Sequence, residues 1–162
     1  MGILGSVASA GTWALLAYLQ SLANLPRFNL TPGWRWFFLV LFGLDLLVSV
    51  LWARQTLRQN MPDSQQLVTT GPYAILRHPM YAAILWNGTG LVAFGSGLWL
   101  VLFGVIPLHI LWTWLVAFEE RKLLDRYGME YQAYANATGQ FFPYLSTLKT
   151  LFQSGPNSGD LD

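Results

Sequence analysis

The sequence predicts an all-α integral membrane protein, a helical bundle of about four transmembrane helices followed by a C-terminal interfacial helix. Hydrophobic residues make up 54% of the 162-residue chain. Charged residues make up only 10%, against roughly 25% in soluble domains. Eight tryptophans, a residue type enriched at membrane–water interfaces, indicate the same class. The net charge of +1 gives a nucleic-acid partner no electrostatic support.

Four apolar segments alternate with short polar or turn-forming stretches. They are residues 2–25, Trp36–Ala53, Pro79–Phe94 and Leu98–Phe118. The last two approach the roughly 20 residues that a helix needs to cross the hydrocarbon core. We expect the chain up to residue 152 to form one membrane domain. Residues 153–162, which are rich in Gly, Ser, Pro and acids, are expected to be a disordered tail.

The interfacial helix is predicted over Glu119–Ala137. Leucine and tyrosine side chains recur there at helical spacing on one stripe, at Leu123, Tyr127, Tyr131 and Tyr134. Gly128 weakens the middle of this segment and predicts a division into two short helices.

The third and fourth spans predict an antiparallel hairpin with its turn at Gly95-Ser96-Gly97. His78 begins the hairpin and Glu119 ends it, so both belong to the same membrane face. Seven basic residues fall on that face, at Arg54, Arg58, Arg77, Arg121, Lys122, Arg126 and Lys149. Only Arg27 and Arg35 fall on the other. The positive-inside rule therefore predicts that the His78 face is cytoplasmic.

Polar, ring-bearing and backbone-restricted residues crowd together just before the third span, from Leu76 to Tyr81. Pro79 lacks an N–H and disfavours helical geometry at His78, so a helix is expected to begin there. Taken alone, this stretch is equally well explained as the membrane anchor of a helix. With Glu119 and Glu120 on the same face, it instead predicts a pocket with an acidic wall and aromatic sides, suited to a cationic, amphipathic ligand.

These residues also form an extended motif. It comprises Gly71-Pro72-Tyr73, Arg77-His78-Pro79, Tyr81, Glu119-Glu120, Leu123, Gly128, Tyr131, Tyr134 and Phe142-Pro143. The pattern, over about residues 64–145, resembles the isoprenylcysteine carboxyl methyltransferase and phospholipid methyltransferase superfamily. That resemblance implies a membrane enzyme that binds S-adenosylmethionine in a helical pocket. The cofactor-binding residues it implies are Gln65, Gln66, Leu67, Val68, Tyr73, Arg77, His78, Pro79, Met80, Tyr81, Glu119 and Glu120.

One position departs from the prenylcysteine branch, which the resemblance credits with an acceptor-binding Arg one helical turn before the first Glu. Here that position is Leu115. A carboxylate acceptor would lose its counter-charge in a medium of low dielectric. Phospholipid amines and other small lipophilic acceptors therefore become as well supported as a prenylcysteine carboxylate. Membrane lipids and lipidated substrates are the expected partners.

Two ionisable residues inside spans, Asp45 and His109, are functional candidates because such groups are rare in membranes. Each can equally be bonded within the bundle, His109 to a backbone carbonyl freed by Pro107. No cysteine and no ligand array with metal spacing is present, so no metal site is predicted. The alternatives to a methyltransferase are an NADPH-dependent membrane sterol-type reductase and a non-catalytic tetraspan scaffold or lipid-binding subunit.

Overall fold

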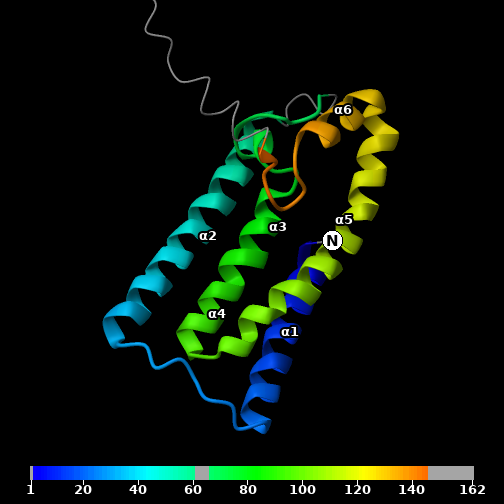
Figure 1. The fold of residues 1–162 in the computed structure, drawn as a ribbon. Coiled ribbons are helices and arrows are strands. Elements are labelled where there is room, and N and C mark those ends of the chain that lie inside the picture. Colours follow the sequence, from blue (N-terminus) through cyan, green and yellow to red (C-terminus); the bar gives the residue numbers. More distant parts are fainter. Residues whose placement is uncertain (1, 61–65, 146–162) are drawn as a thin grey trace, which may run out of the picture.

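A computed structural model describes residues 2–60 and 66–145 as a bundle of helices (Figure 1). The elements in chain order are α1 (Gly2–Leu22), α2 (Pro32–Asn60), the 3₁₀ helix η1 (Gly71–Ala74), α3 (Pro79–Ala83), the π-helix η2 (Ile84–Gly88), α4 (Thr89–Ser96), the 3₁₀ helix η3 (Trp99–Gly104), α5 (Val105–Tyr127) and α6 (Met129–Ala137). Those residues contain no β-strand. The predicted all-α membrane bundle is confirmed; Lys149 and the predicted tail lie outside the described residues.

Three stretches of helix are long and apolar enough to cross a membrane: Gly2–Leu22, Pro32–Asn60 and Trp99–Tyr127. The predicted third span is helical but not uniform, because α3, η2 and α4 follow one another directly over residues 79–96. At ~1.5 Å per residue these 18 residues extend about 27 Å, close to the ~30 Å of a hydrocarbon core. We therefore assign this segment as a further pass.

Several helix ends differ from the prediction: α1 ends at Leu22 and not at residue 25, α2 begins at Pro32 and not at Trp36, and α2 and α5 extend further than expected at their C-terminal ends. Helix α2 continues about two turns past Ala53 to Asn60, because Ala53 and Thr56 are buried on this helix and α2 packs against η1 there. Helix α5 runs without interruption through Glu119 and ends at Tyr127, just before Gly128, whose φ of 55° suits glycine. The predicted interfacial helix is thus the last turns of α5 plus α6, divided at Gly128 as expected. At the C-terminal ends of α2 and α5, the first charged residues, Arg54 and Glu119, mark where the apolar segment ends, but the helix continues beyond them.

The hairpin turn forms as predicted. Gly97 ends α4 in the left-handed region with φ 73°, and the Leu98 N–H donates to the carbonyl of Ala93. A Cβ at Gly97 would lie 3.6 Å from the Arg35 guanidinium and 3.7 Å from Arg27. These two arginines therefore lie at the end of the bundle opposite His78, as the charge count requires.

The core is centred on Trp112 of α5, which is fully buried among Leu85, Leu108 and Val116. Gly5 of α1 lies against its ring, and the indole N–H donates to Ser9 Oγ at 3.1 Å. The small residues Gly5 and Ser9 therefore let α1 pack closely on α5.

Candidate active site

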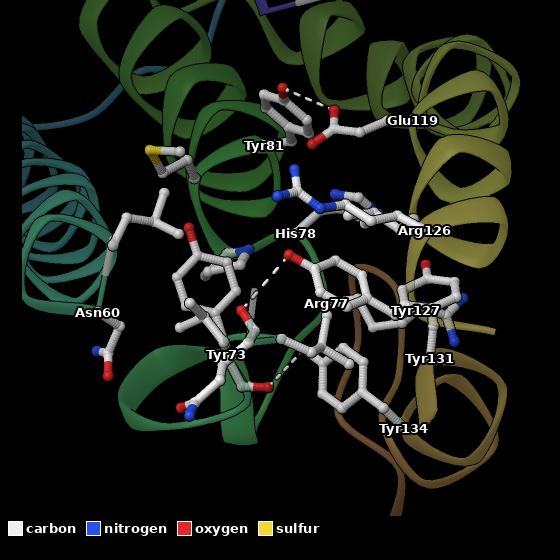
Figure 2. A pocket seen from close by; sticks show the side chains of 17 residues that line it. Asn60, Tyr73, Arg77, His78, Tyr81, Glu119, Arg126, Tyr127, Tyr131 and Tyr134 are labelled. Carbon is white, nitrogen blue, oxygen red and sulfur yellow. Dashed lines mark hydrogen bonds between the residues drawn. The ribbon is translucent and has the colours of Figure 1, made fainter. Parts of the chain in front are cut away.

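A cavity of about 330 Å³ lies at the His78 end of the bundle (Figure 2). The end of α2, the 66–74 segment, the start of α3, the end of α5 and α6 surround it. Its volume is within the ~300–1,000 Å³ of typical small-molecule sites. The lining residues are Leu57, Asn60, Gln66, Leu67, Val68, Tyr73, Arg77, His78, Pro79, Met80, Tyr81, Glu119, Leu123, Arg126, Tyr127, Tyr131 and Tyr134.

Most of the residues predicted from the sequence meet in this cavity. Those that line it are Gln66, Leu67, Val68, Tyr73, Arg77, His78, Pro79, Met80, Tyr81 and Glu119. Gln65 lies outside the described residues. Glu120 is not among the lining residues, because its carboxylate turns toward the start of α3 and the segment after α6. The hairpin does bring Arg77 and His78 (the arginine–histidine corner) close to Glu119 and Glu120 (the acidic pair).

Sequence reasoning missed several lining residues. Leu57 and Asn60 were missed because α2 was expected to end before them. The others, Leu123, Arg126, Tyr127, Tyr131 and Tyr134, come from α5 and α6. Their leucine and tyrosine members form the stripe that predicted an interfacial helix. The signal was therefore present, but the stripe faces a cavity.

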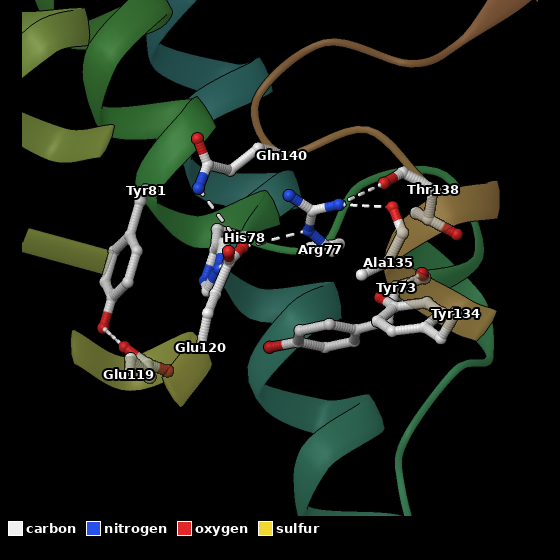
Figure 3. A network of polar contacts seen from close by, with 10 residues as sticks. All are labelled: Tyr73, Arg77, His78, Tyr81, Glu119, Glu120, Tyr134, Ala135, Thr138 and Gln140. Carbon is white, nitrogen blue, oxygen red and sulfur yellow. Dashed lines mark hydrogen bonds and ion pairs between the residues drawn. The ribbon is translucent and has the colours of Figure 1, made fainter. Parts of the chain in front are cut away.

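Glu120 is the centre of a polar network (Figure 3). Its Oε1 accepts a hydrogen bond from Arg77 Nε at 3.0 Å and another from Gln140 Nε2 at 3.2 Å, and it lies 3.0 Å from His78 Nε2. The side chains of Arg77 and Glu120 are 12% and 20% exposed. Hydrogen bonds between ionised groups are stronger than neutral ones, so this network ties α5 firmly to the start of α3.

The same network holds the segment after α6. Arg77 Nη1 donates to the carbonyls of Ala135 and Thr138. The backbone N–H groups of Arg77 and His78 donate to the carbonyls of Gly139 and Gln140, at 2.8 and 3.2 Å. A Cβ at Gly139 would overlap the Phe142 carbonyl, so the tight path of this segment requires a glycine. The segment therefore returns into the bundle, as the orange loop of Figure 1 shows.

Glu119 is placed differently from its neighbour. It lines the cavity, and its Oε2 accepts a hydrogen bond from the Tyr81 hydroxyl at 3.1 Å. The Tyr81 ring stacks on Trp112, with 4.6 Å between ring centroids, which fixes its direction. One carboxylate thus faces the cavity while the other builds the wall.

Five tyrosines line the cavity, among them Tyr73, Tyr131 and Tyr134. The Tyr134 hydroxyl donates to the carbonyl of Tyr73 at 2.7 Å. Burial and the nearby Glu119 carboxylate raise the pKa of Tyr73 to about 12. Burial also raises the pKa values of Tyr131 and Tyr134. These phenols stay neutral at physiological pH, so they offer hydrogen bonds and ring faces and not a base.

The other singled-out residues lie apart from the cavity. Asp45 accepts a hydrogen bond from Asn87 Nδ2 at 2.7 Å. His109 packs against Phe141 and Phe142, and its buried Nδ1 has no hydrogen-bond partner among the described residues. The interpretation that His109 bonds a freed backbone carbonyl therefore finds no contact in support. Leu115 is 2% exposed in the hydrophobic core.

The family model described as phospholipid methyltransferase matches residues 15–130, which include the arginine–histidine corner and the acidic pair. The chain belongs to the phospholipid methyltransferase family. This match agrees with the resemblance drawn from the motifs of the sequence. No solved structure was found to match it.

Two known relatives resemble this family member over part of their length. The nickel-cobalt-cadmium resistance protein NccN of Alcaligenes xylosoxydans xylosoxydans is 33% identical over 87 residues, which is 54% of this chain and 40% of that protein. The cobalt-zinc-cadmium resistance protein CzcN of Cupriavidus metallidurans is 34% identical over 80 residues, 49% of this chain and 37% of that protein. The described part of this chain has no group of three or more His, Asp or Glu side chains arranged to hold a metal ion.

Proposed function

We propose that this membrane methyltransferase transfers a methyl group from S-adenosylmethionine to a lipophilic acceptor at the cytoplasmic face of the membrane. One observation carries the proposal: the cavity combines the Glu119 carboxylate with the rings of five tyrosines. These are Tyr73, Tyr81, Tyr127, Tyr131 and Tyr134. When bound, S-adenosylmethionine supplies a methyl group on a positively charged sulfur that is a good leaving group.

The lining suits a ligand that is cationic in one part and amphipathic elsewhere. Tyrosine faces attract a cation by ~0.5–2 kcal/mol each, more strongly where water is excluded. The Glu119 carboxylate, oriented by Tyr81, is placed to accept hydrogen bonds from an ammonium or ribose group. His78 is 6% exposed and lines the same wall, so its ring is held in one orientation.

The residues of this site act by positioning and by excluding water. A displacement at carbon needs the two reacting groups in line, and holding them so is worth several kcal/mol. The neutral tyrosines cannot serve as bases, and the Glu120 carboxylate is occupied by three partners. The acceptor must therefore arrive as a competent nucleophile, or lose its proton to Glu119, to His78 or to water.

The acceptor classes are a phospholipid amine, a prenylcysteine carboxylate or a similar lipophilic group. Leu115 lies in the apolar core beside Trp112, so this position offers no counter-charge to a carboxylate. An amine or another uncharged nucleophile needs no such partner, and we favour it on that ground. The cytoplasmic assignment follows from the basic residues at the cavity end, such as Arg54, Arg58 and Arg121.

Calorimetric titration of the detergent-solubilised protein with S-adenosylmethionine tests the cofactor. We expect Glu119→Gln to weaken binding by roughly 10- to 100-fold, the worth of a hydrogen bond to a charged group. Glu130→Gln, on the exposed side of α6, is the matched control and should leave the affinity unchanged. Equal affinity in the two variants would contradict the assigned role of Glu119.

A second measurement separates the rival functions. Incubation with methyl-labelled cofactor and a total lipid extract should yield a labelled lipid, whose identity defines the acceptor. Saturable binding of NADPH instead would indicate a reductase. Binding of neither cofactor would indicate a scaffold or lipid-binding subunit.

A further inference from the structure

A second cavity of about 430 Å³ lies within the membrane-spanning part of the bundle. Its walls come from α2, from η2 with α4, and from η3 with the first turn of α5; they include Phe42, Trp86, Gly90, Phe94, Phe103 and Ile106. Phe103 and Ile106 are 56% and 62% exposed, so on this side the cavity is a groove open to the bilayer. Its occupant must be apolar.

Part of the groove wall departs from regular α-helix. Trp86 belongs to the π-helix η2, and Phe103 belongs to the 3₁₀ helix η3. Gly90 has no side chain, and a Cβ there would lie 2.9 Å from the Phe42 ring. π-turns are rare, and many of those known lie at functional sites. The π-helix η2 and the 3₁₀ helix η3 both line this groove, which indicates that the groove binds a ligand.

Two ring contacts and one hydrogen bond connect the groove to the candidate active site. Trp86 lines the groove and packs on Phe142, with 4.5 Å between ring centroids, and its Nε1 lies 3.4 Å from the Phe141 carbonyl. Phe141 in turn lies 6.0 Å from the His78 ring, which lines the site. Phe141 and Phe142 therefore stand between the two cavities, and we call this pair the partition.

We propose that the groove holds the hydrocarbon chain of the methyl acceptor and that the acceptor's polar end reaches the site past the partition. This inference rests on the proposed function. The nine residues from Trp86 to Phe94 are separated by eight helical rises, which give the groove a length of about 12 Å. A transmembrane helix of a partner, ~10 Å across with its side chains, is too wide for a groove of this volume. A lipid chain fits both the length and the apolar lining.

His109 gives the partition a polar side. Its ring lies 5.4 Å from Phe141 and 5.8 Å from Phe142, and its buried Nδ1 lacks a partner in residues 2–60 and 66–145. Buried polar atoms are nearly always hydrogen-bonded. The polar end of an acceptor that moves between the cavities passes this atom, which can then make the missing hydrogen bond.

The test uses two isoleucines one turn apart on α5. Ile106 lines the groove, whereas Ile110 does not, and both are exposed, at 62% and 66%. Ile106→Trp should fill the groove, and Ile110→Trp adds the same bulk next to it. The probe is a phosphatidylethanolamine with a photoactivatable diazirine on its acyl chain, reconstituted with each protein in phosphatidylcholine vesicles. Mass spectrometry then maps the labelled peptides.

We expect labelling of the 86–106 peptides to fall about tenfold in Ile106→Trp and to stay at the wild-type level in Ile110→Trp. Methyl incorporation into lipid should fall in parallel, with the affinity for S-adenosylmethionine unchanged. Equal labelling of the two variants, as for lipids that merely surround the protein, would overturn the proposal. So would measurable methyl incorporation that is equal in the two variants. The labelling needs no cofactor, so a wild-type protein that transfers no methyl group would refute the proposed function and leave the groove tested independently.

Discussion

Removal of the Arg77 side chain tests whether the polar network holds the site together. In Arg77→Ala the Glu120 carboxylate loses its ion pair, and the carbonyls of Ala135 and Thr138 lose a shared donor. His78 and Gln140 remain as the partners of Glu120. We expect the segment after α6 to detach from the bundle more readily than any other described part.

The magnitude follows from burial. Breaking a buried ion pair by removing one partner costs about 3 to 5 kcal/mol. Arg77 and Glu120 keep 12% and 20% side-chain exposure, so we place the loss of unfolding free energy at the lower end, about 3 kcal/mol. For a chain of this length that corresponds to a fall in Tm of about 6 to 12 °C.

Thermal unfolding of the cofactor-free protein in detergent, followed by tryptophan fluorescence, measures this effect. Arg121→Ala is the matched control, because Arg121 is exposed and its cationic carbon lies 5.8 Å from the Phe118 ring. It should cost less than ~1 kcal/mol. In a Glu120→Gln background, Arg77→Ala should cost at least ~1 kcal/mol less than in the wild type, since no buried charge is then left without its cation. Equal Tm values for Arg77→Ala and Arg121→Ala would refute the reasoning.

Two further predictions concern packing and alkaline pH. Gly5→Ala places a Cβ 2.3 Å from the Trp112 ring and should lower the free energy of unfolding by about 1 to 3 kcal/mol. Gly11→Ala is the control and should leave it unchanged, because no atom lies within 4 Å of its Cβ. Equal unfolding temperatures of the two variants would contradict the packing of α1 on α5. The pKa of Tyr73 is about 12 in the folded protein and 10.0 unperturbed, so its contribution to stability is complete below pH 10 and is lost as the pH rises from 10 to 12. In Tyr73→Phe the free energy of unfolding should therefore fall less steeply between pH 10 and 12 than in the wild type. If the fall is unchanged, ionisation of groups other than Tyr73 causes it.

The fold was predictable because composition and hydrophobic segments dominate the energetics of a membrane protein. The turn at Gly97 and the break at Gly128 were readable for a related reason, since both need a positive φ that glycine adopts without strain. The π-helix η2 was not readable. One inserted residue rotates those after it by about 100° relative to a continuous α-helix. The faces of Asn87 and Gly90 therefore follow from tertiary packing and not from the period of the sequence.

The candidate site was predictable as a neighbourhood but not in the role of each residue. Spacing along the hairpin brought His78 and Glu119 to one face, which requires only that the chain turn once. The division between Glu119 and Glu120 depends on side-chain direction and on the path of residues 138–142, which no local pattern encodes. The converse case is the tyrosine stripe, Tyr127, Tyr131 and Tyr134. Its helical spacing was recognised correctly, but the stripe was predicted to lie at the lipid interface, whereas its side chains line the cavity.

Adjacent carboxylates on one helix can take different roles because successive side chains point about 100° apart. Glu120 points toward Arg77 and His78, where its charge is compensated, and so it fixes the wall of the cavity. Glu119 faces the cavity, and its hydrogen-bond partner within residues 2–60 and 66–145 is the Tyr81 hydroxyl. A cationic ligand stabilises a carboxylate that has one neutral partner far more than one that already has a cationic partner. The reason is that the desolvation cost of the first carboxylate has not been compensated by an opposite charge. The same hairpin register that satisfies Glu120 therefore leaves Glu119 facing the cavity, where a cation can bind it.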